Sequence, residues 1–193
     1  MALTPSTMLP LGTPAPDFQL EDVVSGKAIS LATFAERQAL LVIFGCQHCP
    51  FVKHVQSELA QLSRDYADRS LGIVFVSAND ITTHPSDSPE HLKAMALERG
   101  FLFPVCYDST QDVAKAYTAA CTPDFFLFDR DRQLVYRGQL DDSRPSNGIP
   151  VTGADLRAAI DATLANLTVA PSQKPSIGCN IKWKPGLEPA YAG

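Results

Sequence analysis

Two cysteines separated by two residues, Cys46 and Cys49, have the spacing in this chain that most clearly indicates chemistry. They follow the apolar run 39–44 and Gly45 and precede Pro50, so we expect them where a buried strand gives way to a helix. A disulfide between residues three apart requires a tight turn, and the first turn of a helix provides one. Amides at a helix N-terminus also lower the pKa of a nearby thiol. The pattern therefore predicts a redox-active dithiol.

The side chain that would assist this dithiol is His48, which stands between the two cysteines. We expect Cys46 to carry the thiolate, the species that attacks a disulfide or a peroxide, and His48 to donate a hydrogen bond or positive charge to it. Stabilising the reduced form in this way makes the corresponding disulfide a stronger oxidant.

Two other interpretations of the pair remain open, namely ordinary buried side chains or half of a zinc site. A zinc site requires a second pair of ligands, and Cys106 with Cys121 is not spaced as one. His54 is more typical of the surface of a helix than of a ligand, and the pattern around His84 and His91 indicates no role. We therefore expect a redox centre without metal or cofactor.

The elements that must position the dithiol alternate between strand and helix at first and end with a hairpin and a helix. Their apolar patterns predict an α/β sandwich with a central mixed sheet. The polar segment 141–144 is expected to be a solvated loop, because charged clusters in loops usually face water. The expected elements are strands at 39–44 and 73–76, helices after Pro50, from Ser88 to Gly100, from Ser109 or Thr110 to Tyr117 and after Thr152, a short extended piece at 103–105, and a hairpin of 125–128 with 134–136.

The chain of 193 residues fits one domain, expected at 1–170, followed by an irregular tail at 171–193 that packs on or near it. The net charge is −5 and the basic residues do not cluster, which excludes the pattern of a nucleic-acid binder. No apolar run reaches the length of a membrane span, which is about 20 residues. The N-terminus does not have the pattern of a secretory signal, so we expect a cytoplasmic protein.

Three segments together carry a resemblance to a known family: the opening segment 12–20, the motif from Cys46 to Cys49, and Thr122-Pro123 before a strand. This chain resembles the thioredoxin-like superfamily, and specifically the redoxin branch that includes peroxiredoxins and the disulfide reductases related to them. The resemblance extends from about Gly12 to the closing helix. It implies a thioredoxin-like three-layer α/β/α sandwich.

The resemblance also implies roles for residues outside the motif. Pro123 matches the cis proline that faces the dithiol in thioredoxin-like proteins, which would place the carbonyl of Thr122 beside the sulfurs, where an extended substrate segment could pair with it. Cys121 would lie near the dithiol, either as a third redox partner or as a small buried residue. Cys179, on a tail expected to be mobile, could resolve a mixed disulfide.

These features predict a thiol-disulfide oxidoreductase whose partners are protein or small-molecule thiols and disulfides. Cys46 would attack the substrate and Cys49 would resolve the mixed disulfide. Peroxiredoxins have Thr or Ser three residues before their reactive cysteine and Arg in place of the cis proline, whereas this chain has Ile43 and Pro123. An antioxidant thiol peroxidase using Cys46 and a Cu(I)-binding protein using the motif are the alternatives. The direction of electron flow, the electron donor, and the choice between monomer and dimer are left open by the sequence.

Overall fold

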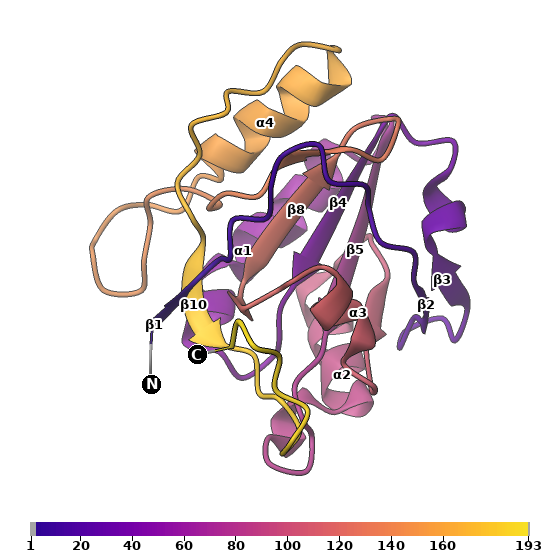
Figure 1. The fold of residues 1–193 in the computed structure, drawn as a ribbon, viewed down its shortest axis with the longest axis vertical. Helices are drawn as coiled ribbons and strands as arrows, with labels where there is room; N and C mark the ends of the chain where they lie inside the picture. Colours follow the sequence, from indigo (N-terminus) through magenta and orange to yellow (C-terminus); the bar gives the residue numbers. More distant parts are fainter. Residues whose placement is uncertain (1–2, 193) are drawn as a thin grey trace.

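The computed structural model describes residues 3–192, and a five-stranded mixed sheet forms its centre (Figure 1). The strand order is β6-β5-β4-β8-β9. Parallel pairing joins β4 to β5 and β5 to β6, while β8 is antiparallel to both β4 and β9. The expected mixed sheet is thus confirmed. Its strands are β4 (Ala39–Phe44), β5 (Leu71–Ser77), β6 (Val105–Tyr107), β8 (Asp124–Phe128) and β9 (Leu134–Tyr136).

Both faces of this sheet are covered, which explains why β4 is apolar without alternation. Leu41 and Ile43 point into one core cluster, with residues of three helices, α1, α2 and α4. Leu40 and Val42 point into the other, with α3 and the segments before β4. Alternate side chains of a strand face opposite ways, so the expected three-layer arrangement is confirmed. The helices are α1 (Pro50–Asp65), α2 (Pro89–Arg99), α3 (Asp112–Ala116) and α4 (Ala154–Leu164), with short 3-10 turns η1 (Leu31–Phe34) and η2 (Pro85–Asp87).

The predicted bounds of α2 are confirmed, because Ser88 is its N-cap and Gly100 ends it in the left-handed conformation with φ 65°. The starts of two other helices were predicted wrongly. Gln111 precedes α3 in place of Ser109 or Thr110, and Gly153 precedes α4 in place of Thr152.

The cause at α4 is the buried side chain of Asp141. Its carboxylate accepts hydrogen bonds from the backbone N–H groups of Thr152 and Gly153, both at 2.7 Å, and of Ser143 at 2.9 Å. A carboxylate from a distant loop therefore satisfies the donors near the start of this helix. The prediction that 141–144 is a solvated loop was wrong for Asp141, which is 4% exposed.

Two small sheets complete the structure. β2 (Gln19–Glu21) pairs with β3 (Ala28–Ser30). The second sheet has the order β1-β10-β7, with β1 (Leu3–Pro5), β10 (Ile177–Asn180) and β7 (Cys121–Thr122), and Figure 1 shows β1 and β10 side by side. The tail was predicted to be irregular, but it contains β10, because the backbone groups of β7 find their hydrogen-bonding partners there. No helix within residues 3–192 is long and apolar enough to cross a membrane.

Candidate active site

The two cysteines of the motif lie between the end of β4 and the start of α1, as predicted. Cys49 is the N-cap of α1, with φ −65° and ψ 126°, and Pro50 occupies the first turn, where its missing N–H costs nothing. Both cysteine side chains are fully buried. The N-cap side chain makes no capping hydrogen bond to this helix.

Thr122, which precedes Pro123, lies against these sulfurs. The peptide bond between them is cis, as the resemblance implies. The hydroxyl oxygen of Thr122 is 3.6 Å from the Cys46 sulfur, and its carbonyl oxygen is 3.2 Å from the Cys49 sulfur. The carbonyl accepts a hydrogen bond when Cys49 is protonated and repels its thiolate. Thr122 therefore contacts both members of the dithiol.

The hydrogen bonds around the dithiol favour the thiolate form of Cys49 over that of Cys46, whereas the sequence led us to expect it on Cys46. A hydrogen bond from Cys46, together with those from Cys179 and Thr122, outweighs burial and lowers the pKa of Cys49 to about 4. The same bond with Cys49, together with burial, raises the pKa of Cys46 well above its ordinary value. The physical reason is position, since the Cys49 sulfur lies among these donors and the hydrogen bond from Cys46 has the largest effect.

His48 bonds to a buried carboxylate, not to the thiolate as we expected. Its Nδ1 is 2.5 Å from Oδ2 of Asp87, which is completely buried. Oδ1 of Asp87 accepts the backbone N–H groups of Gln47 and His48 at 2.8 and 3.0 Å, and Asn79 donates to Oδ2 at 2.8 Å. Burial alone would raise the pKa of Asp87, but the hydrogen bonds from His48 and Asn79 outweigh it and leave that pKa below its usual value. Asp87 thereby holds the turn between the two cysteines.

The sequence pattern gives no indication of Asp87 or Asn79, and we predicted no role for His84. All three follow β5 in the loop 78–88. The ring of His84 packs against that of His48, with centroids 4.9 Å apart and an angle of 33° between the planes, and burial lowers the pKa of His84. One signal could have found this loop. It follows the carboxyl end of a strand parallel to β4, and the carboxyl ends of neighbouring parallel strands meet at one edge of a sheet.

The remaining cysteines differ in their relation to the dithiol. Cys179 lies opposite Thr122 in the register of β10 with β7, and its sulfur is 2.9 Å from that of Cys49. Burial and the hydrogen bond with Cys49 raise the pKa of Cys179 to about 12. Cys121 contacts backbone carbonyls instead, with its sulfur 3.6 Å from the oxygen of Pro123, and burial raises its pKa well above the ordinary value. Cys106 lies in the second core cluster, as predicted.

Three side chains of the site have the composition of a metal-ligand set. One ligand atom each from Cys46, His48 and Asp87 lies within 4.8 Å of the others. Both oxygens of Asp87 already accept hydrogen bonds, from His48 and Asn79 among others. A cation at this position would therefore have to displace donors that are well placed. His54, outside this set, is half-buried, with Nε2 2.7 Å from the hydroxyl oxygen of Ser143.

Comparisons with known proteins agree with this fold. The Redoxin family model matches residues 10–156. An uncharacterized conserved protein from Geobacillus kaustophilus is 54% identical, with a TM-score of 0.94 over 96% of this chain and 98% of that one. A hypothetical protein from Sinorhizobium meliloti is 50% identical, with a TM-score of 0.93 over 95% of this chain and 100% of that one. The thioredoxin domain of a thiol-disulfide oxidoreductase from Bacteroides vulgatus shares the fold at 23% identity, with a TM-score of 0.57 over 67% of this chain and 88% of that one. No curated protein gives a match.

Proposed function

This chain belongs to the redoxin family and has a thioredoxin-like fold, and from that premise we propose that it is a thiol-disulfide oxidoreductase working through a Cys46–Cys49 disulfide. The observation that carries the proposal is the buried turn between β4 and α1. It holds two sulfurs against Thr122 and lowers the pKa of one of them to about 4. A thiolate at neutral pH is the species that exchange with a disulfide requires. The proposed substrates are protein or small-molecule disulfides.

The reaction begins with a proton transfer inside the reduced pair. Both sulfurs are buried, and we assign the outward attack to Cys46 because the Cys49 sulfur is already in contact with the Cys179 sulfur at 2.9 Å and the Thr122 carbonyl oxygen at 3.2 Å. The proton of Cys46 passes to Cys49 along their hydrogen bond, and the Cys46 thiolate attacks one sulfur of the substrate disulfide. A Cys46–substrate bond forms and the other substrate sulfur leaves.

The second step releases the substrate. Cys49 gives up its proton and attacks the Cys46 sulfur, the Cys46–Cys49 bond forms, and the second substrate sulfur leaves. The substrate gains two electrons from the dithiol and two protons, one of which is the proton that Cys49 gives up. The other proton comes from water, because Cys49 is already ionised in the reduced protein. His48, whose side chain is 22% exposed, is placed to assist proton transfer to a leaving sulfur, while Asp87 fixes its ring. The reverse reaction follows the same path, and its direction depends on the potential of the substrate.

The test is reduction of insulin disulfides with dithiothreitol as the electron source. Cys46→Ser should abolish turnover because it removes the attacking sulfur. Cys49→Ser should accumulate a mixed disulfide between Cys46 and the substrate, visible by mass spectrometry under non-reducing conditions. Cys106→Ala, in the core of β6, is the matched control and should turn over like the wild type. Undiminished turnover by Cys46→Ser would refute the mechanism.

Metal binding is a second candidate, because Cys46, His48 and Asp87 bring ligand atoms within 4.8 Å of one another. A soft ion such as Cu(I) would suit the cysteine and histidine. Elemental analysis of protein purified without chelator tests this candidate directly. A stoichiometric metal that disappears in Asp87→Ala and persists in Asp131→Ala would favour it over disulfide exchange.

The peroxidase alternative gains less support from the geometry. Ile43, three residues before Cys46, is fully buried in the core, and Pro123 stands where a peroxiredoxin would place Arg. Neither side chain can donate a hydrogen bond to a peroxide oxygen. Stopped-flow measurement of hydrogen peroxide consumption by the reduced protein separates the two activities.

A further inference from the structure

The C-terminal tail occupies the place beside the cis proline where an extended substrate could pair. β10 is antiparallel to β7, with Cys179 opposite Thr122 and Asn180 opposite Cys121. β-strand addition is a common way for a protein to hold an extended peptide, since the backbone supplies the affinity and the side chains supply the specificity. This chain therefore presents its own peptide to its own dithiol, and that peptide carries a cysteine.

The close approach of the tail depends on one glycine. A Cβ on Gly178 would lie 2.0 Å from the carbonyl oxygen of Thr122, a distance that real Cβ atoms do not show. The missing side chain lets the next residue bring its sulfur 2.9 Å from that of Cys49. A disulfide has its sulfurs about 2.05 Å apart. The two sulfurs therefore need to close by only about 1 Å to bond.

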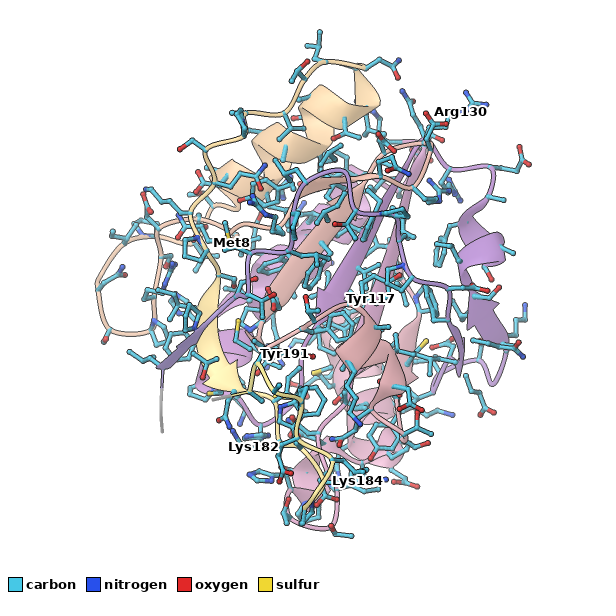
Figure 2. All side chains as sticks on the ribbon, in the orientation of Figure 1. Met8, Tyr117, Arg130, Lys182, Lys184 and Tyr191 are labelled. Atoms are coloured by element: carbon cyan, nitrogen blue, oxygen red, sulfur yellow. The ribbon has the colours of Figure 1, made fainter. Side chains whose placement is uncertain are left out.

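The tail is held in this position on both sides of Cys179, so it was wrong to expect a mobile segment there. The Cys179 side chain is 1% exposed. Figure 2 shows Lys182 and Lys184 on the stretch that follows β10, and the Lys182 backbone bonds to the loop after β5. The fixing hydrogen bonds are Ser6 N–H to Ser176 O, Ile181 N–H to Ala120 O, Asp80 N–H to Lys182 O, and Lys182 N–H to Asn79 Oδ1.

We propose that Cys179 is a third redox-active cysteine and that β10 is an internal substrate strand, which exchanges with the Cys46–Cys49 disulfide to give a Cys49–Cys179 disulfide. The Cys179 sulfur attacks that of Cys49, the Cys46–Cys49 bond breaks and the Cys49–Cys179 bond forms. The proton of Cys179 ends on Cys46. No electrons enter or leave, because one disulfide replaces another.

This inference rests on the proposed function, which supplies the first disulfide. Its consequence is a second oxidised form in which the tail is bonded over the site and Cys46 is again a thiol. That thiol can attack a further substrate disulfide. The protein would then hold an oxidised pair and a nucleophile at the same time, which two cysteines alone cannot do.

The first experiment removes Cys46 and asks whether the other two sulfurs still join. Cys46→Ser is treated with diamide, then blocked with N-ethylmaleimide and digested with trypsin under non-reducing conditions. We expect the loss of two thiols and a cross-link between the peptides 38–53 and 158–182, which contain Cys49 and Cys179. The matched control, Cys46→Ser with Cys179→Ser, should lose no thiol within one chain.

The second experiment leaves Cys49 and Cys179 in place and blocks the approach of the strand. Gly178→Ala should lose the Cys49–Cys179 cross-link in the Cys46→Ser background, because its Cβ meets the Thr122 carbonyl. In the otherwise unchanged chain the Cys46–Cys49 disulfide should still form. Gly186→Ala is the control on the same tail, since nothing lies within 4 Å of the Cβ it would add, although its φ of 79° is strained for alanine. Circular dichroism at the assay temperature verifies that each variant is folded.

The outcomes separate the inference from the function on which it rests. If the folded Cys46→Ser variant keeps all its thiols under diamide while the wild type forms Cys46–Cys49 and reduces insulin, the role of Cys179 is refuted and the function stands. If the wild type neither forms Cys46–Cys49 nor reduces insulin, the function itself is refuted. A cross-link that survives Gly178→Ala would show that the strand pairing does not present Cys179.

Discussion

The buried carboxylate of Asp87 offers the sharpest test of how the active-site turn is held. Replacing Asp87 by Asn keeps the shape and one acceptor oxygen, so the N–H groups of Gln47 and His48 can still be satisfied. The new amide nitrogen, however, faces the side chain of Asn79 and the ring of His48, which both donate to Oδ2 in the wild type. Two hydrogen bonds to a charged group are lost.

The expected cost follows from those two bonds. Each hydrogen bond to a charged group contributes about 1.5–3 kcal/mol, so we expect the loss of two to lower the free energy of unfolding by about 3–6 kcal/mol. For a chain of this length, 1 kcal/mol shifts Tm by about 2–4 °C, which gives a decrease of roughly 10 °C. Insulin reduction should also slow, because His48 loses the group that orients it.

The effect should depend on pH with a definite sign. The pKa of Asp87 is lower in the folded protein than its ordinary value, so its ionisation stabilises the fold above about pH 4. That stabilisation disappears as the pH falls through the lowered folded value. The difference in stability between wild type and Asp87→Asn should therefore be constant near neutrality and shrink below about pH 4.

Urea denaturation monitored by circular dichroism, at neutral pH and at about pH 3, measures both quantities. Asp131→Asn is the matched control, because Asp131 is exposed and its carboxylate makes no hydrogen bond or ion pair among the described residues. A variant at Asp87 that is as stable as this control at neutral pH would refute the role assigned to the carboxylate. So would a loss of stability that stays the same down to about pH 3.

Three further predictions concern Gly45, Thr122 and Asp124. A Cβ on Gly45 would lie 2.3 Å from Cζ of Phe75, so Gly45→Ala should cost about 1–3 kcal/mol in urea denaturation; Phe75→Leu should recover part of this, and strict additivity would argue against the clash. Thr122→Val removes a hydroxyl whose hydrogen bond lowers the pKa of Cys49, so the absorbance of the thiolate should titrate about one pH unit higher. An unchanged titration midpoint would exclude that hydrogen bond. Burial raises the pKa of Asp124 to about 7, so the wild type should lose stability as the pH rises from about 4 to 7 and Asp124→Asn should not; parallel stability curves would contradict this.

Much of the fold could be predicted because it depends on patterns among residues that are close together in the sequence. The continuous apolar run 39–44 predicts a strand buried on both faces, and the stripe after Pro50 predicts the helix that covers one of them. The cap at Ser88 and the glycine at 100 bound α2 as predicted. The tail is different. Its polar composition gives no sign of β10, because that strand exists only where β1 and β7 supply its partners from the far ends of the sequence.

The candidate active site likewise has one part that could be predicted from the sequence and one part that could not. The cysteine spacing and Pro123 predict where the dithiol lies, since both depend on residues adjacent in sequence. The lowered pKa of Cys49 depends on hydrogen bonds from Cys46, Thr122 and Cys179. The partner of His48 is 39 residues away, in a loop whose composition suggested only solvent exposure. Those relationships arise from the tertiary structure and are invisible in a local pattern.

Segments from near both ends of the chain lie beside the reactive sulfurs. β1, which begins at Leu3, pairs with β10 in the last fifth of the sequence, and β10 carries Cys179. The region matched by the family model, 10–156, includes neither strand. A gene fragment trimmed to that region would encode a protein without β1 and β10, and an affinity tag at the N-terminus would be attached close to the start of β1. Preparations that differ only in the position of the tag should therefore differ in how fast alkylating reagents modify Cys49. Kinetic work on this protein is best begun with untagged protein.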